Sequence, residues 1–165
     1  MIANIKFAKV RPNAKIPTKR IEDVGMDIYA CFDEDWICIP PHSNKLIPTG
    51  IASACDSNWG IVFRERGSTG VKNMKINAGV IDSGFRGEYF VCLYNGNDVP
   101  LYIAKYLDGE QAPEDKNAIL YPYSKAIAQA LVVEVPTVHV QEISYEELQD
   151  IPSERGVGQI GSSGK

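Results

Sequence analysis

Short runs of apolar or alternating residues recur along the chain and are separated by turn residues. Most runs are four to ten residues long and rich in Ile, Val, Tyr and Phe, which favour strands. Pro-Pro at 40–41, Asn-Gly at 95–96 and Asp-Gly at 108–109 act as turn signals. The pattern predicts an all-β barrel or sandwich with strands at residues 5–10, 36–39, 45–47, 60–63, 89–94, 101–104, 126–135 and 137–142.

Helix is scarce in this pattern. Ser144 and Glu147 form a capping box ahead of Leu148, which predicts a helix of one or two turns. Residues 108–117 are acidic, poor in apolar side chains and long for a hairpin loop, so we interpret the region 105–122 as an inserted loop. We therefore expect a β domain at 1–151, followed by a flexible arm at 152–165.

Composition limits the class of protein. The 165 residues are 44% hydrophobic and 23% charged, which is typical of one globular domain, and the net charge of −4 argues against a general nucleic-acid surface. No run is long enough to cross a membrane and no signal peptide is evident, so a cytoplasmic protein is expected. The four cysteines lack a C-x-x-C pair and only two histidines are present, which favours free thiols over a zinc site.

The segment from Arg155 to Lys165 holds four glycines, two serines and a cation at each end. Glycines let successive N–H groups turn toward one point, and an Arg can donate two hydrogen bonds to one phosphate. The segment could close over a polyphosphate. The alternative is a solvated Gly/Ser tail.

Three further turns hold residues that could bind phosphate or accept a proton. Residues 25–28 place Asp27 at the start of a strand, and residues 64–70 combine two cations, two hydroxyls and two glycines as a phosphate cradle without the P-loop pattern. In residues 77–88, Ser83-Gly84 indicates a hairpin turn with Asp82 at its mouth. A carboxylate there could accept a proton from an attacking water, unless it only serves the turn.

Taken in order, these segments resemble the motifs of the trimeric dUTPase family (dUTP diphosphatases). The matching segments are 24–28 for the first motif, 66–69 for the second, 79–87 for the third, 126–129 for the fourth and 155–164 for the fifth, with 47–50 also shared. The resemblance implies a β jelly roll that forms a homotrimer, with active sites shared between subunits and a flexible C-terminal arm. It also implies Mg²⁺-assisted hydrolysis of dUTP to dUMP and pyrophosphate.

The resemblance further implies a role for each matching residue. Asp82 would be the general base for water attack on the α-phosphorus, and Asp27 would lie toward the metal through water. Phe85 would stack under deoxyribose, where the family has Tyr. The implied substrate-binding residues are Arg66, Gly67, Ser68, Thr69, Asn77, Ala78, Gly79, Ile81, Phe85, Gln129, Arg155, Ile160, Gly161, Ser162 and Ser163.

The chain departs from the family pattern in places. Gly67 stands where the second motif has Ser, and Ile160 replaces the Phe expected over uracil. Two alternatives stay open at this point. One is a dCTP deaminase, or a bifunctional deaminase and dUTPase, of the same fold, for which Glu88 is the nearby candidate proton shuttle. The other is a dUTP-sensing regulatory protein with the 105–122 loop as its partner surface.

Overall fold

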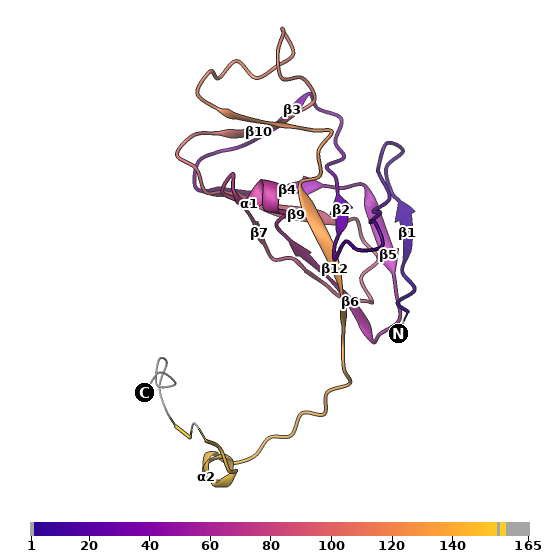
Figure 1. The fold of residues 1–165 in the computed structure, drawn as a ribbon, viewed down its shortest axis with the longest axis vertical. Helices are drawn as coiled ribbons and strands as arrows, with labels where there is room; N and C mark the ends of the chain where they lie inside the picture. Colours follow the sequence, from indigo (N-terminus) through magenta and orange to yellow (C-terminus); the bar gives the residue numbers. More distant parts are fainter. Residues whose placement is uncertain (1, 155, 158–165) are drawn as a thin grey trace. The chain divides into compact units, whose positions relative to one another are not determined.

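The computed structural model describes residues 2–154 and 156–157. The chain divides into two compact units, Met1–Val135 and Pro136–Lys165. This boundary falls earlier than the division at 151/152 expected from the sequence. The first unit holds all of the strands found among the described residues, together with one short helix (Figure 1).

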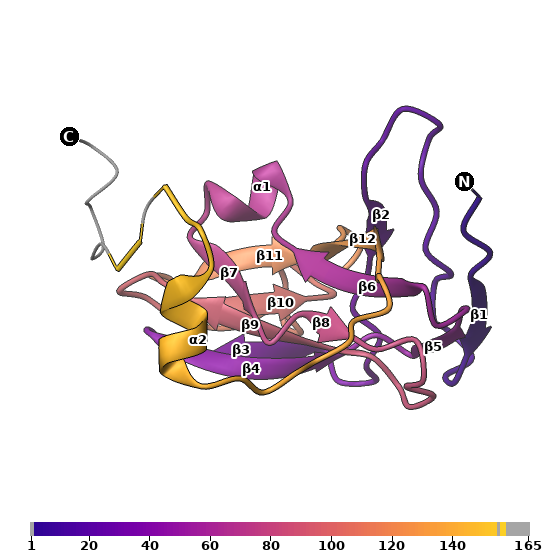
Figure 2. The same ribbon diagram turned by 90° about the horizontal axis from the view of Figure 1, so that it is seen from below.

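The first unit is built from four small sheets. Their strand orders are β1-β5, β11-β10-β3, β2-β12-β6-β8 and β4-β9-β7. The pair β1-β5 lies away from β3 and β10 in both ribbon views (Figures 1 and 2). The strands are β1 Lys6–Lys9, β2 Met26–Ile28, β3 Trp36–Ile39, β4 Ser43–Pro48, β5 Ile51–Ala54, β6 Trp59–Arg64, β7 Met74–Asn77, β8 Val80–Ile81, β9 Phe90–Asn95, β10 Leu101–Ala104, β11 Ile119–Pro122 and β12 Ala128–Glu134.

Strand β9 shows how the side-chain alternation builds the core. Val91 and Leu93 are fully buried, whereas Phe90 is exposed on the other face of the strand. Successive strand side chains point to opposite faces, so this alternation turns one face toward the core. The buried cluster continues through the aliphatic side chains of β3, β6 and β10.

The sheet β2-β12-β6-β8 positions most of the candidate site. Gln129 of β12 lies opposite Asp27 of β2 on one side and opposite Arg64 of β6 on the other. Along β6, Val62 and Ile61 pair with Val80 and Ile81 of β8, and Phe63 N donates to Gly79 O. The sheet register therefore brings the first, second and fourth motif segments to the Arg64 end of β6, whereas the third motif starts beside Phe63 and runs back, so that Asp82 follows β8 toward the Trp59 end.

The all-β class is confirmed, and strands 36–39 and 101–104 have the predicted bounds. The helix after Ser144 is also confirmed as α2, Tyr145–Asp150, in the second unit, with both capping-box hydrogen bonds formed. Among the described residues, no helix is long and apolar enough to cross a membrane.

Three local predictions were wrong. Residues 137–142 form no strand, although their apolar residues alternate. The 105–122 region is not a loop throughout, because β11 at 119–122 pairs in parallel with β10. The turn at Ser83-Gly84 forms, but it joins no hairpin: β8 before it pairs with β6, and β9 after it pairs with β4 and β7.

Candidate functional site

A cleft of about 960 Å³ opens beside the end of β6. One wall is the loop that precedes β2, and the other is the turn that follows β6. Both walls carry charged or polar side chains, and Gln129 of β12 lies between them. The lining residues are Thr18, Lys19, Arg20, Glu22, Asp23, Val24, Gly25, Asp27, Arg66, Gly67, Ser68 and Gln129.

An ion pair joins the two walls. Arg66 Nε lies 2.8 Å from Asp27 Oδ1, and Nη2 donates to Asp27 Oδ2 at 3.3 Å. The same guanidinium donates from Nη1 to Ser68 Oγ at 3.2 Å and to the Ala126 carbonyl at 3.5 Å. A planar guanidinium that makes two contacts to one carboxylate is fixed in orientation as well as in position.

The backbone of Arg66 is fixed by Thr69. Thr69 is fully buried in α1, Gly67–Gly70, and its Oγ1 accepts from Arg66 N and donates to Arg66 O, both at 3.0 Å. A buried hydroxyl that satisfies two backbone groups keeps the turn in one shape. Ser68 is exposed at the cleft, whereas Gly67 has no atom within 4 Å of a Cβ placed on it.

Gln129 has a defined amide orientation. Its Nε2 donates to the Glu65 carbonyl at 2.7 Å, which leaves Oε1 on the cleft side of the amide. A Cβ placed on Gly25 would lie 2.6 Å from this Oε1, so glycine at 25 makes room for the amide. The Glu65 carboxylate accepts from Ile76 N at 2.8 Å.

The third motif forms a different depression. Asp82 and Ser83 line a smaller pocket of about 130 Å³ together with Ile81, at the other end of β6. Phe85 N donates to Asp82 O at 3.1 Å, which closes the turn. Within the described part of the chain, no group bonds the Asp82 carboxylate, so its oxygens can accept from water.

The ring of Phe85 is half exposed and stacks on Tyr89, with centroids 6.0 Å apart and planes at 13°. Arg86 Nη1 donates to the carbonyls of Ser83, Phe85 and Ser53 at 2.5, 3.0 and 3.4 Å. One guanidinium therefore ties the turn that carries Asp82 to strand β5.

The short connection between β7 and β8 has unusual backbone geometry. Ala78 has a φ of +50°, a left-handed conformation that non-glycine residues seldom adopt. Gly79 O accepts from Phe63 N at 2.7 Å, and Asn77 Nδ2 donates to Asn44 Oδ1 at 2.7 Å. Both hydrogen bonds hold the connection against neighbouring strands.

Glu88 has structural partners. Its carboxylate accepts from Arg11 Nε at 2.8 Å and Nη2 at 3.2 Å, and also from Gly50 N at 2.9 Å. Hydrogen bonding to Glu88 raises the pKa of the Arg11 guanidinium. The Glu88 carboxylate therefore joins Arg11 to the backbone at Gly50 and serves the structure of this region.

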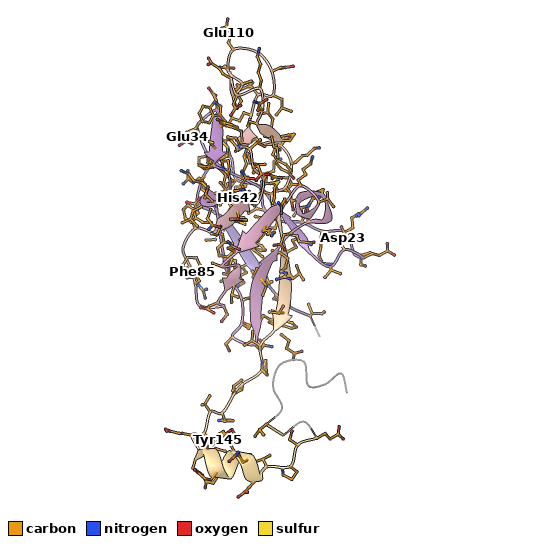
Figure 3. All side chains as sticks on the ribbon, turned by 90° about the vertical axis from the view of Figure 1, so that its left-hand side faces the viewer. Asp23, Glu34, His42, Phe85, Glu110 and Tyr145 are labelled. Atoms are coloured by element: carbon orange, nitrogen blue, oxygen red, sulfur yellow. The ribbon has the colours of Figure 1, made fainter. Side chains whose placement is uncertain are left out.

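The single chain does not bring Asp82 and Arg66 together. Asp82 lies one residue beyond the Ile61–Ile81 pair, four residues along β6 from Arg64. At a strand rise of about 3.3 Å per residue, that separation is about 13 Å. Figure 3 agrees, because Asp23 at the rim of the Arg66 cleft and Phe85 beside Asp82 lie on opposite sides of the sheets.

Part of the predicted set lies outside the described residues. Arg155, Ile160, Gly161, Ser162 and Ser163 fall there. Conversely, three features of the site were not predicted from the sequence: the backbone-bracing role of Thr69, the carbonyl contacts of Arg86 and the partners of Glu65. The Thr69 role had a signal in the sequence, since a Thr three residues after Arg66 at a turn is placed for a local cap.

Known proteins with similar sequences identify the family. The dUTPase family model matches residues 12–107, which is more than half of the chain. The deoxyuridine 5′-triphosphate nucleotidohydrolase of Nautilia profundicola is 30% identical over 165 residues, covering 98% of this chain and 99% of that protein. The corresponding protein of Clostridioides difficile is 30% identical over 165 residues, with 98% of each covered.

Solved structures agree on the fold. A variant of the Staphylococcus bacteriophage 80alpha dUTPase with dUpNHpp has a TM-score of 0.78 at 20% identity, covering 98% of this chain and 99% of that one. A dUTPase variant of S. aureus phage phi11, described with a structural Mg(II) ion, has a TM-score of 0.67 at 19% identity, covering 87% and 99%. The fold, the ordered motif segments and the sequence relatives together place this chain in the dUTPase family.

Proposed function

We propose that this chain hydrolyses dUTP to dUMP and pyrophosphate. The observation that carries the proposal is the convergence of Asp27, Arg66, Ser68 and Gln129 in one polar cleft of a dUTPase-family fold. Such a cleft offers a cation, hydroxyl and amide groups to a phosphate chain. The relatives named as deoxyuridine 5′-triphosphate nucleotidohydrolases support the substrate.

In this proposal, Asp82 takes a proton from the water that attacks the α-phosphorus. Ile81 and the turn at Asn77, Ala78 and Gly79 receive the uracil, and Phe85 covers the deoxyribose. The tie that Arg86 makes to β5 keeps the carboxylate and the ring in fixed relative positions. A fixed position of these two groups supports the proposed role of the turn in catalysis, because the reaction rate falls steeply when reacting groups are misplaced.

Arg66 and Ser68 bind phosphate oxygens in the proposal, with Gly67 and Thr69 shaping the turn that presents them. Gln129 accepts from a bound water through Oε1, since its Nε2 already donates to Glu65 O. Arg155, Ser162 and Ser163 close over the terminal phosphate, with Ile160 and Gly161 beside the base. An arm that orders over substrate excludes water from the reacting phosphate.

Mg²⁺ is the proposed cofactor. Within residues 2–154 and 156–157, no group of three or more His, Cys, Asp or Glu side chains is arranged to hold a metal. That fits an ion held mainly by substrate phosphates and water, the usual mode for Mg²⁺ with nucleotides. When bound, it would neutralise charge on the triphosphate.

We also propose that the working unit is a homotrimer, in which one chain's Asp82 meets another chain's Arg66. The distance between these residues within one chain supports sharing. Mixing inactive Asp82→Asn chains with inactive Arg66→Ala chains tests this. If sites are shared, random reassembly restores about a quarter of wild-type activity, whereas sites confined to single chains stay inactive.

The function itself is tested by pyrophosphate release with Mg²⁺ from dUTP, dCTP, dTTP and UTP. We expect release from dUTP alone and a loss of about 10²–10⁴-fold in Asp82→Asn. Asp98→Asn, at a carboxylate that is 96% exposed and contacts His42, is the matched control. Deleting residues 155–165 should lower turnover sharply while the β unit stays folded.

Two alternatives give different results in the same assay. A dCTP deaminase would release ammonia from dCTP, but the three hydrogen bonds to Glu88 leave its carboxylate committed to Arg11 and Gly50. A dUTP-sensing regulatory protein would bind dUTP without turnover. Either outcome would overturn the proposed function.

A further inference from the structure

The ion pair between Asp27 and Arg66 suggests a role for Asp27 beyond that of a metal-facing carboxylate. Both carboxylate oxygens contact the guanidinium, at 2.8 and 3.3 Å, and the two side chains are only 35% and 30% exposed. Asp27 takes the Nε–Nη2 edge of Arg66, and Nη1 faces Ser68 and Ala126. Each nitrogen of the guanidinium therefore lies within 3.5 Å of a protein oxygen before any substrate arrives.

The two partners differ in how firmly they are held. Asp27 lies within β2, where it pairs across the sheet with Gln129, and its N donates to Thr18 O at 3.3 Å. Arg66 lies beyond the end of β6, on a long side chain with many rotamers. A short side chain on a paired strand can restrain a long side chain on a turn, and the reverse is much less effective.

We propose that Asp27 is a positioning residue that orients the Arg66 guanidinium for the phosphate chain of the nucleotide. The inference rests on the proposed function of the cleft. Restraining Arg66 in advance reduces the rotamer entropy lost when phosphate binds. The restraint also keeps the Nη1 side of the guanidinium beside Ser68, so that the two groups meet the same phosphate.

A role through Arg66 and a role through the metal predict different results in a double-mutant cycle. If Asp27 acts through Arg66, Asp27→Ala should raise the KM for dUTP by about 10-fold in wild type and by less than about 2-fold in Arg66→Ala. A carboxylate acting through the metal would give equal effects in both backgrounds. Its loss would also raise the Mg²⁺ concentration for half-maximal activity, which a positioning role leaves unchanged.

Asp23→Ala is the matched control. Asp23 makes a similar two-contact pair with Arg20 at the same cleft rim, at 2.9 and 3.0 Å, but does not contact Arg66. Its removal should change KM by less than about 2-fold, because exposed pairs contribute little. Asp27→Asn keeps an acceptor oxygen for Arg66 and should show a smaller defect than Asp27→Ala.

Equilibrium binding of dUpNHpp to the same variants provides a readout that does not depend on turnover. The coupling between Asp27 and Arg66 should appear in the dissociation constants as it does in KM. Equal losses in both backgrounds, or no loss in Asp27→Ala, would overturn the inference. If Asp27→Ala fails to fold, Asp27→Asn replaces it in the double-mutant cycle with Arg66→Ala. A wild-type chain that binds dUpNHpp but does not turn over dUTP would refute the proposed function alone.

Discussion

The substitution Gly79→Ala tests the backbone contact between the β7–β8 connection and β6. A Cβ on Gly79 would lie 2.6 Å from the Phe63 carbonyl oxygen and 3.2 Å from the Phe63 Cβ. The first distance is to backbone, so no side-chain rotation relieves it. The connection must move away from β6, and the hydrogen bond from Phe63 N to Gly79 O, now 2.7 Å, lengthens.

The expected cost follows from these contacts. Forced displacement of packed backbone costs about 1–3 kcal/mol and a weakened hydrogen bond about 1 kcal/mol. Replacing glycine also reduces the conformational entropy of the unfolded chain, which stabilises the folded state by about 0.4–1 kcal/mol. The net loss of about 1–3.5 kcal/mol corresponds to a melting temperature lower by about 2–14 °C for a protein of this size.

Thermal unfolding followed by circular dichroism measures this effect, at one protein concentration because an oligomer's melting temperature depends on it. Gly84→Ala is the control, since a Cβ there has no atom within 4 Å. We expect that variant to melt at or slightly above the wild-type temperature. If the Gly79→Ala and Gly84→Ala variants have the same melting temperature, the steric argument is wrong. A raised KM for dUTP in Gly79→Ala alone would further link this connection to the nucleobase.

The remaining predictions concern three polar side chains. Thr69→Val should cost about 1–3 kcal/mol of folding free energy, because it leaves Arg66 N without a partner, although Arg66 O still accepts from Thr69 N and Gly70 N; denaturant titration measures this cost. Burial raises the pKa of the Glu65 carboxyl, but the N–H groups of Ile76 and Glu65 together with the charges of Arg64 and Lys75 outweigh burial, and the net pKa is lowered. Glu65 therefore contributes stability above its unfolded pKa of about 4.3, and Glu65→Gln should lose that contribution at pH 7 but approach wild type as the pH falls through the folded pKa. A difference in unfolding free energy between wild type and Glu65→Gln that does not change with pH would contradict this. Glu88→Gln should lower the melting temperature yet leave pyrophosphate release confined to dUTP, whereas altered nucleotide selectivity would refute its structural role.

The sequence predicted the strand-rich class because apolar runs and alternation are local properties. Residues 36–39 and 101–104 are short continuous apolar runs, and both form strands with the predicted bounds. Residues 137–142 alternate between polar and apolar side chains but form no strand. A strand needs a partner for its backbone groups, and alternation alone does not supply one.

The strands that were missed depend on contacts distant in sequence. Residues 51–54 form β5 by pairing with β1, and residues 119–122 form β11 by pairing in parallel with β10. The second case follows an acidic stretch that resembles a loop by composition, and Pro122 ends the strand. Proline is tolerated at such an edge because its missing N–H faces away from the ladder.

The candidate site could likewise be predicted from the sequence only in part. Motif spacing identified Asp27, Arg66 and Gln129 individually, but only the register of β2, β12 and β6 brings them into one cleft. The same register carries Asp82 to the far end of β6. A sequence pattern states which residues occur and in what order, whereas a sheet decides which of them meet. One copy of this fold therefore does not bring Asp82 and Arg66 together. The mixing experiment measures whether a reaction that needs both residues takes one of them from a second copy.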